Sequence, residues 1–109
     1  MELNRTATEK EMKLIELLID KSNLTISGNW KEGLLVRPMN DDGMGSLLLF
    51  PYGKIIDGRL MGEQVSDFQF KDIDGIDVIA SLNLDSEGNL FELDMWKTDF
   101  SKLLKFPEL

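Results

Sequence analysis

The segment from Val78 to Trp96 constrains the fold more than any other part of the chain. It reads Val-Ile-Ala-Ser-Leu-Asn-Leu, then Asp-Ser-Glu-Gly-Asn, then Leu-Phe-Glu-Leu-Asp-Met-Trp. Two runs rich in alternating apolar residues, separated by a short turn that contains Gly, are typical of a β-hairpin. The segment therefore predicts two antiparallel strands and a fold that is built on a sheet.

Two registers of this hairpin are compatible with the sequence. The turn at Asp85–Gly88 favours a three-residue loop with Leu84 opposite Leu90, which mixes apolar and charged groups on both faces. Burying a carboxylate costs several kcal/mol, whereas a strained turn or a bulge costs about 1–3 kcal/mol. We therefore predict a register shifted by one residue, with a four-residue loop or a bulge that absorbs the mismatch. Its apolar face contains Val78, Ala80, Leu82, Leu84, Phe91, Leu93 and Met95, with Leu84 opposite Phe91, Leu82 opposite Leu93 and Ala80 opposite Met95.

The shifted register places Glu92, Asp94 and Trp96 on the opposite face of the hairpin, with Asn83 across from them. From Asp72 to Trp96 there are seven carboxylates and no Lys or Arg. Acidic strips attract basic partners, and Trp is over-represented among interface anchors. We therefore predict that Asn83, Glu92, Asp94 and Trp96 form a contact surface for a protein partner. The alternative is an ordinary solvated sheet face.

The remainder of the chain predicts one helix followed by further strands. Thr8 to about Lys21 begins with a capping box and has apolar residues at helical spacing. Short apolar runs then alternate with Gly, Asp and Asn, as in an antiparallel sheet. The expected strands are Leu34–Arg37, at an edge or ending near Pro38, then Ser46–Phe50, a less certain one at Lys54–Ile56, and one containing Val65, Phe68 and Phe70. Asp99 can cap a final helical turn through Lys105.

These elements predict a single α+β domain over residues 1–109. Its N-terminal helix packs on one face of a mostly antiparallel sheet of five to six strands in a meander, and a short helical turn ends the chain.

The composition excludes several kinds of chemistry. The chain has no Cys and no His, so it offers no Cys nucleophile, no His base and no ordinary zinc site. We expect no cofactor, no metal and no catalytic residue. The net charge of −8 disfavours nucleic acid and anionic membranes as partners. Without a secretion signal or an apolar run of membrane-spanning length, the cytoplasm is the default location.

Two motifs suggest ligands when taken alone. Asp72–Asp77 resembles a calcium loop, but its Gly comes at the fourth position and Asn83 replaces the final Glu of an EF-hand, so a turn is the better interpretation. Glu92 and Asp94 form a pair of carboxylates, the groups that hydrolyse glycosides in many enzymes. Alternate acids on an exposed strand are common, so this pair is weak evidence for such a reaction. The loop Tyr52–Gly62 offers Arg59 as an anion ligand, which is weak evidence for a small-ligand site.

The C-terminal half resembles a known group of proteins. The block Ala80–Asp85, Gly88, Leu90–Lys97 and Asp99–Ser101, with Gly33–Val36, Pro38–Asp41 and Gly43–Ser46, is similar to small bacterial proteins described only as a domain of unknown function. The resemblance implies a bacterial, single-domain protein with a helix before a β-meander, and it implies no activity. In size and charge alone the chain also resembles immunity proteins that neutralise secreted toxins.

Three functional hypotheses follow from the sequence. The first is a non-catalytic domain that binds a basic protein partner, for example as an immunity or antitoxin-like inhibitor. The second is a homodimeric structural or regulatory domain that associates through a sheet edge or the Trp96 face. The third is a small-ligand domain or enzyme that uses the Tyr52–Gly62 loop.

Overall fold

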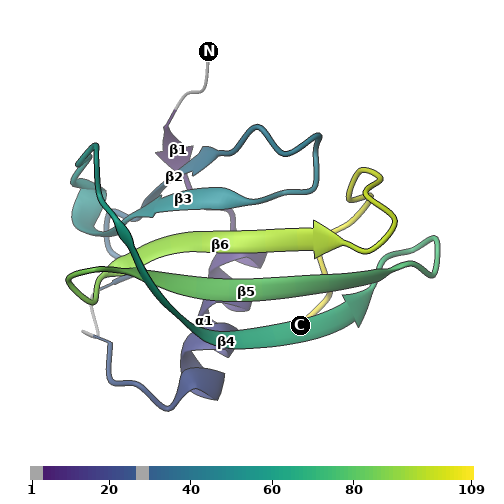
Figure 1. The fold of residues 1–109 in the computed structure, drawn as a ribbon, viewed down its shortest axis with the longest axis horizontal. Helices are drawn as coiled ribbons and strands as arrows, with labels where there is room; N and C mark the ends of the chain where they lie inside the picture. Colours follow the sequence, from purple (N-terminus) through teal and green to yellow (C-terminus); the bar gives the residue numbers. More distant parts are fainter. Residues whose placement is uncertain (1–3, 27–29) are drawn as a thin grey trace.

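A computed structural model describes residues 4–26 and 30–109, and over this part of the chain one helix packs on one six-stranded antiparallel sheet (Figure 1). The predicted α+β class is therefore confirmed. The strands are β1 (Arg5–Thr6), β2 (Leu35–Pro38), β3 (Leu47–Phe50), β4 (Met61–Lys71), β5 (Asp77–Asp85) and β6 (Leu90–Lys97). The helix is α1 (Glu9–Ser22), and a 3-10 turn spans Pro51–Gly53.

The strand order differs from a simple meander. It is β1-β2-β3-β6-β5-β4, so two antiparallel three-stranded meanders meet where β3 pairs with β6. After β3 the chain crosses to the far edge of the sheet, and β4, β5 and β6 then return toward β3 (Figure 1). The closing contact pairs Leu47 with Leu93 and Leu48 with Glu92. Because this contact joins residues far apart in sequence, no local pattern indicates it.

The helix follows the sequence prediction closely. Thr8 is its N-cap, and both hydrogen bonds of the capping box with Glu11 are present. Asn23 ends the helix in the left-handed region, with φ +59°. The buried apolar side chains of the helix are Leu14, Ile15, Leu18 and Ile19. They pack on the sheet, so the stripe read from the sequence is the face that α1 buries.

Two predicted elements differ from the structure. Lys54–Ile56 forms no strand and lies in an exposed loop. The chain makes one turn after β6, where the Phe100 N–H donates to the Lys97 carbonyl, but residues 101–109 adopt no regular structure. The predicted helical turn through Lys105 is therefore not formed. The reason is that the N–H groups of Leu104 and Lys105 bind the carboxylate of Asp72 across the fold.

The β5–β6 hairpin combines the two registers considered above. Near the turn, Asp85 donates its N–H to Asn89 and Leu84 lies opposite Leu90, as the turn residues favour. A bulge between Asn83 and Leu84 then shifts the register, and Leu82 faces Leu93 while Ala80 faces Met95. The predicted pairs and the predicted bulge are therefore confirmed beyond the turn.

The bulge changes the position of two side chains. The predicted pairing of Leu84 with Phe91 is wrong. The register changes between Asn83 and Leu84, so Leu84 pairs with Leu90 and Phe91 has no partner on β5. Leu90 is consequently part of the core, whereas Phe91 lies against Arg59 outside it. One extra residue thus satisfies both the turn and the burial of the apolar face.

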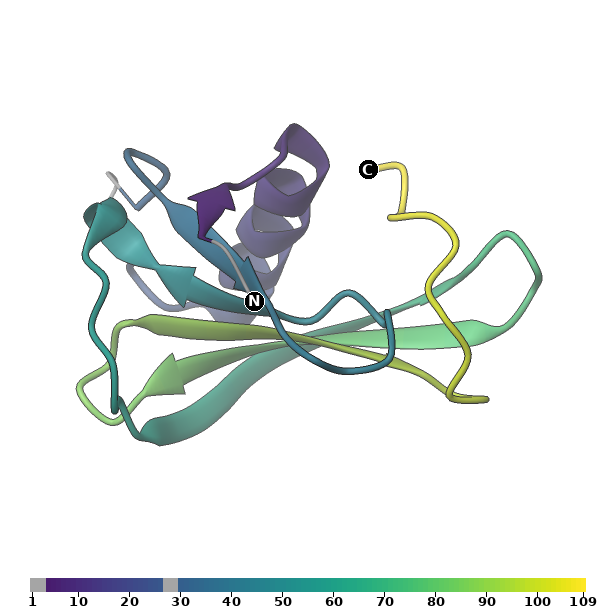
Figure 2. The ribbon, with the colours of Figure 1, turned by 90° about the horizontal axis from the view of Figure 1, so that it is seen from above.

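The helix covers one face of the sheet, and the segment between β3 and β4 crosses one end of the other face (Figure 1). The helix and the end of the C-terminal tail (residues 98–109) lie on the same side of the sheet, as Figure 2 shows. The core between the helix and the sheet includes Leu14 and Leu18 from α1 and Ala80, Leu82 and Leu93 from the sheet. No described helix covers the opposite face, which we call the outer face (Figure 2).

Gly62 lets the beginning of β4 approach the main chain of β5 closely. A Cβ atom built at Gly62 would lie 2.3 Å from the Asp85 carbonyl oxygen, a rigid main-chain atom. We expect Gly62→Ala to lower the free energy of unfolding by about 1–3 kcal/mol, because the strand must move to relieve this overlap. Urea denaturation tests the expectation, with the exposed neighbour Glu63→Ala as the control. Equal stability of the two variants would contradict it.

Candidate functional site

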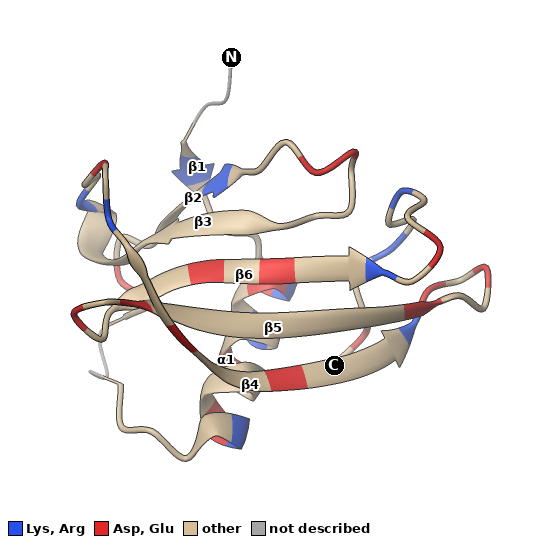
Figure 3. Ribbon diagram, viewed as in Figure 1, with Lys and Arg blue, Asp and Glu red and all other residues tan. Residues whose placement is uncertain are grey.

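The outer face carries polar side chains in rows that cross the sheet. Glu92 of β6 lies opposite Leu48 of β3 on one side and Asn83 of β5 on the other. In the next row Asp94 lies opposite Ser81, which in turn faces Asp67 of β4. We call Asp67, Glu92 and Asp94 the acidic strip. Figure 3 shows these carboxylate positions along β6 and on β4.

The structure places all four residues of the predicted contact surface on this outer face. Asn83 is buried, Glu92 is half-buried, and Asp94 and Trp96 are exposed. The Asn83 side-chain amide donates to a Glu92 carboxylate oxygen at 3.2 Å. The Ser46 hydroxyl donates to Asp94 at 3.3 Å and fixes its position against β3. Because successive side chains of a strand point to opposite faces, the sequence predicts correctly that these four residues share one face.

The acidic strip is electrostatically unfavourable in the isolated chain. Burial and then the neighbouring charge of Asp94 raise the pKa of Glu92 above its ordinary value, against a smaller opposite effect of Asn83. The side-chain oxygen of Asn83 is buried and accepts no hydrogen bond within the described part of the chain. A cationic group placed at Glu92 would relieve the first of these features, because it would pair with the carboxylate.

An aromatic pair lies at the end of β6 beside the acidic strip. Trp96 keeps 45% of its surface exposed and Phe100 keeps 67%, and their ring centroids are 6.2 Å apart. Phe100 adopts a left-handed backbone with φ +63°, which is uncommon for a bulky residue. Two large exposed rings next to carboxylates supply the apolar area that an acidic strip lacks.

Arg59 belongs to the outer face as well, but its guanidinium is used within the chain. It donates to the Asp85 carboxylate at 3.3 Å, to the Leu90 carbonyl at 2.9 Å and to the Leu49 carbonyl. Its carbon centre lies 5.3 Å from the ring centre of Phe50 and 4.9 Å from that of Phe91. The structure thus places Arg59 as the residue that fastens the loop 51–60 to the sheet.

A cleft lies between this loop and the turn of the β5–β6 hairpin. It has a volume of about 250 Å³, and its lining includes Tyr52, Ile56, Arg59 and Asp85. Two of the groups that line it, Arg59 and Asp85, are paired with each other. Asp85 also accepts the N–H groups of Glu87 and Asn89. The polar groups at this end therefore stabilise the turn and the loop.

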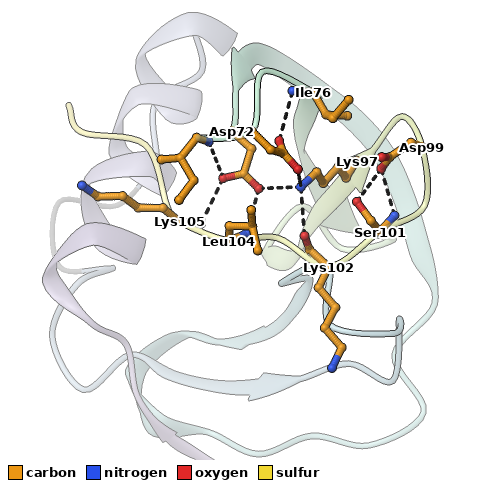
Figure 4. Close-up of polar contacts among 10 residues, drawn as sticks. Asp72, Ile76, Lys97, Asp99, Ser101, Lys102, Leu104 and Lys105 are labelled. Carbon is orange, nitrogen blue, oxygen red and sulfur yellow. Dashed lines mark hydrogen bonds and ion pairs between the residues drawn. The ribbon is translucent and has the colours of Figure 1, made fainter.

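A buried ionic cluster at the other end of the sheet was not predicted from the sequence. The Lys97 ammonium donates to Asp72 at 2.9 Å, to Asp74 at 2.7 Å and to the Lys102 carbonyl at 3.0 Å (Figure 4). All three of its N–H groups are thereby used. Lys97 is only 1% exposed. The predicted turn is present, since the Gly75 N–H donates to the Asp72 carbonyl, and the carboxylates of Asp72 and Asp74 also hold an ammonium group.

The same cluster ties the C-terminal tail to the β4–β5 turn. Asp72 accepts the N–H groups of Leu104 at 2.7 Å and Lys105 at 3.1 Å (Figure 4). Burial alone would raise the pKa of Asp72, but the hydrogen bonds from Leu104, Lys97 and Ile73 outweigh it and lower the pKa. Burial would likewise lower the pKa of Lys97, but Asp74 and Asp72 raise it. One signal was available in the sequence: Lys97 continues the inward alternation of Leu93 and Met95.

The described residues include no group of three or more Asp or Glu side chains arranged to hold a metal ion. Within the same residues, no helix has the length and apolar character needed to cross a membrane.

These features define a small two-layer α+β domain with one acidic, partly aromatic sheet face. A family model described as a domain of unknown function (DUF6984) matches residues 4–107, and the chain therefore belongs to that family. The predicted kind of family, one without an assigned function, is confirmed. Comparisons with curated proteins and with solved structures gave no match.

Proposed function

We propose that this protein is a non-catalytic binding domain whose outer face recognises a basic segment of another protein. The main support for this proposal is the acidic strip on the sheet face that no described helix covers, next to the exposed Trp96–Phe100 pair. An immunity or antitoxin-like inhibitor of a basic protein is one concrete form of this function.

The electrostatics support a basic partner. Neither β3 nor β5 contains a Lys or Arg, and β6 has none before Lys97. The two arginines near this face are held elsewhere: Arg37 binds Asn4, and Arg59 binds Asp85 and two carbonyl groups. A Lys or Arg side chain from a partner would pair with the half-buried Glu92 carboxylate beside Asn83. Such a contact lowers the raised pKa of Glu92, so part of its free energy comes from relieving a cost present in the free protein.

The proposal predicts that charge reversal on this face abolishes capture of a partner. We expect the variant carrying Glu92→Lys and Asp94→Lys to bind at least about 100-fold more weakly, because like charges across an interface cost several kcal/mol. The measurement is affinity capture from a lysate of the native host at low and moderate salt. Dissociation constants are then measured for the captured protein.

The matched control reverses two charges elsewhere. Asp20 lies in the last turn of α1 and Glu32 lies in the loop before β2, and both are exposed. The variant with Asp20→Lys and Glu32→Lys changes the net charge equally, so it should retain the affinity to within a few-fold. A partner lost equally from both variants would show that net charge alone attracts it. Capture of no protein at either salt concentration would refute the proposal.

A further inference from the structure

The edge of the sheet formed by β4 is open. β4 is the last strand of the sheet, and no strand in residues 4–26 or 30–109 pairs with its other side. Its first half is irregular, with register shifts between Met61 and Gln64 and between Gln64 and Ser66. From Ser66 to Lys71 it pairs with β5 without interruption. This second half is therefore a regular template for another strand.

The hydrogen bonds around β4 determine which of its main-chain groups face outward. The Asp72 N–H donates to the Ile76 carbonyl, and the Thr98 N–H donates to the Asp77 carbonyl. Asp72 therefore faces β5, whereas Asp77, opposite Lys71, faces β6. Residues of an antiparallel strand alternate in this respect. The N–H and C=O groups that point away from β5 are consequently those of Asp67, Gln69 and Lys71.

This edge is complementary to itself. If two copies of β4 run antiparallel about a twofold axis at Gln69, the Asp67 of each copy lies directly opposite the Lys71 of the other. Phe68 then lies opposite Phe70 on the helix side. Asp67, Gln69 and Lys71 are exposed, and Phe68 and Phe70 are half-buried. Opposite charges and aromatic pairs in facing positions both stabilise paired strands.

Charged side chains are one usual protection of an edge strand, and this segment carries Asp67 and Lys71. Three other protections, which are Pro, bulges and charged residues that point inward, are missing from it. Ser66–Lys71 contains no Pro, its pairing is regular, and its inward side chains include both phenylalanines. Lys71 already pairs with Asp77 of its own chain at 2.9 Å, and its remaining N–H groups are free to bind a second carboxylate.

We propose that two copies of this protein associate through β4, antiparallel and centred on Gln69, so that their two sheets become one. The twofold axis then stands perpendicular to the sheet. It follows that both acidic strips lie on the same side of the dimer. The dimer is a separate inference from the binding of a basic partner, and each is tested by its own measurement.

The first test is a charge swap, read out as the dissociation constant of the dimer by sedimentation equilibrium. Asp67→Lys replaces two attractive pairs with two repulsive ones, so we expect dimerisation to weaken at least tenfold. Adding Lys71→Glu to that variant restores opposite charges and should recover most of the loss. Glu87→Lys, which makes the same charge change at the hairpin turn, should have no effect. Equal weakening by Asp67→Lys and Glu87→Lys, or no recovery in the double variant, would overturn the register.

The second test is amide hydrogen exchange at low and high protein concentration. The amides of Asp67, Gln69 and Lys71 should exchange more slowly as the concentration rises, whereas those of Phe68 and Phe70 bond to β5 in either state. Gln69→Pro removes an outward N–H without removing a bond to β5, and this variant should be folded and monomeric. A wild-type chain that stays monomeric at millimolar concentration, with unchanged exchange at these three amides, would refute the proposal.

Discussion

Replacing Asp72 with Ala is expected to lower the free energy of unfolding by about 3–5 kcal/mol. The change removes one of the two carboxylates that bind the Lys97 ammonium, which is 1% exposed. It also leaves the N–H groups of Leu104 and Lys105 without their acceptor. Breaking one side of a buried ionic cluster is costly because the remaining charge has too few partners. Urea denaturation followed by circular dichroism measures the change.

Two further variants separate this explanation from a general effect of losing a carboxylate. Asp77→Ala breaks the exposed pair with Lys71, and it should leave the unfolding midpoint almost unchanged. Adding Lys97→Met to Asp72→Ala removes the buried charge that lost its partner, so the double variant should be more stable than Asp72→Ala alone. A double variant less stable than either single variant would show that the buried charges are not the cause.

The pH dependence of stability provides a second measurement of the same cluster. The pKa of Asp72 is lowered in the folded protein, so its contribution is present above the ordinary value of 3.8 and is lost as the pH falls through the folded value. The pKa of Lys97 is raised, so its contribution is present below 10.5 and is lost as the pH rises through the folded value. The Asp72→Ala variant should therefore lose less stability than the wild type on acidification.

This cluster also explains why the C-terminal segment departs from its sequence prediction. Asp99 does act locally, since it accepts the N–H and hydroxyl of Ser101. A helix through Lys105 would need the next N–H groups for itself, yet those of Leu104 and Lys105 bind Asp72. Asp72 is about thirty residues away in the sequence. A capping residue indicates where a helix can start, but not which distant acceptor competes for its amides.

The hairpin shows how much the residues alone determine. The turn favours one register and burial of the apolar face favours another, and the sequence prediction keeps the second register up to Leu84. The structure keeps the turn pairing of Leu84 with Leu90 and then changes register at a bulge. The cost of one bulge is smaller than that of burying Glu92 and Asp94. A bulge is therefore the less costly solution, and its position between Asn83 and Leu84 is what the sequence leaves open.

The candidate face could be predicted where it depends on alternation, and not where it depends on long-range contacts. Asn83, Glu92, Asp94 and Trp96 share a face because strand side chains alternate. The position of Arg59 depends on Asp85, Leu90 and Leu49, which lie on three different strands. A loop residue whose partners come from three strands leaves no periodic signal in the sequence.

Replacing Arg59 with Ala is expected to lower the free energy of unfolding by about 2–4 kcal/mol. The guanidinium is held by two main-chain carbonyls and by Asp85, which is buried, so its removal leaves these acceptors without their donor. It also removes the cation between the rings of Phe50 and Phe91. Because Arg59 fastens the loop 51–60, limited proteolysis should cut the variant within that loop at conditions where the wild type resists.

Two substitutions test whether the planar shape of the Arg59 guanidinium matters for the stability of the loop. Arg59→Lys keeps the charge, but one ammonium cannot match a planar group with donors on both sides, so we expect it to recover little stability. Arg37 lies 5.0 Å from the same Phe50 ring, but its polar partners are Asn4 and the exposed Asp57. Arg37→Ala should therefore cost less than about 1 kcal/mol. Full recovery by Arg59→Lys would mean that charge alone fastens the loop, whereas equal losses at Arg59 and Arg37 would assign the effect to ring stacking.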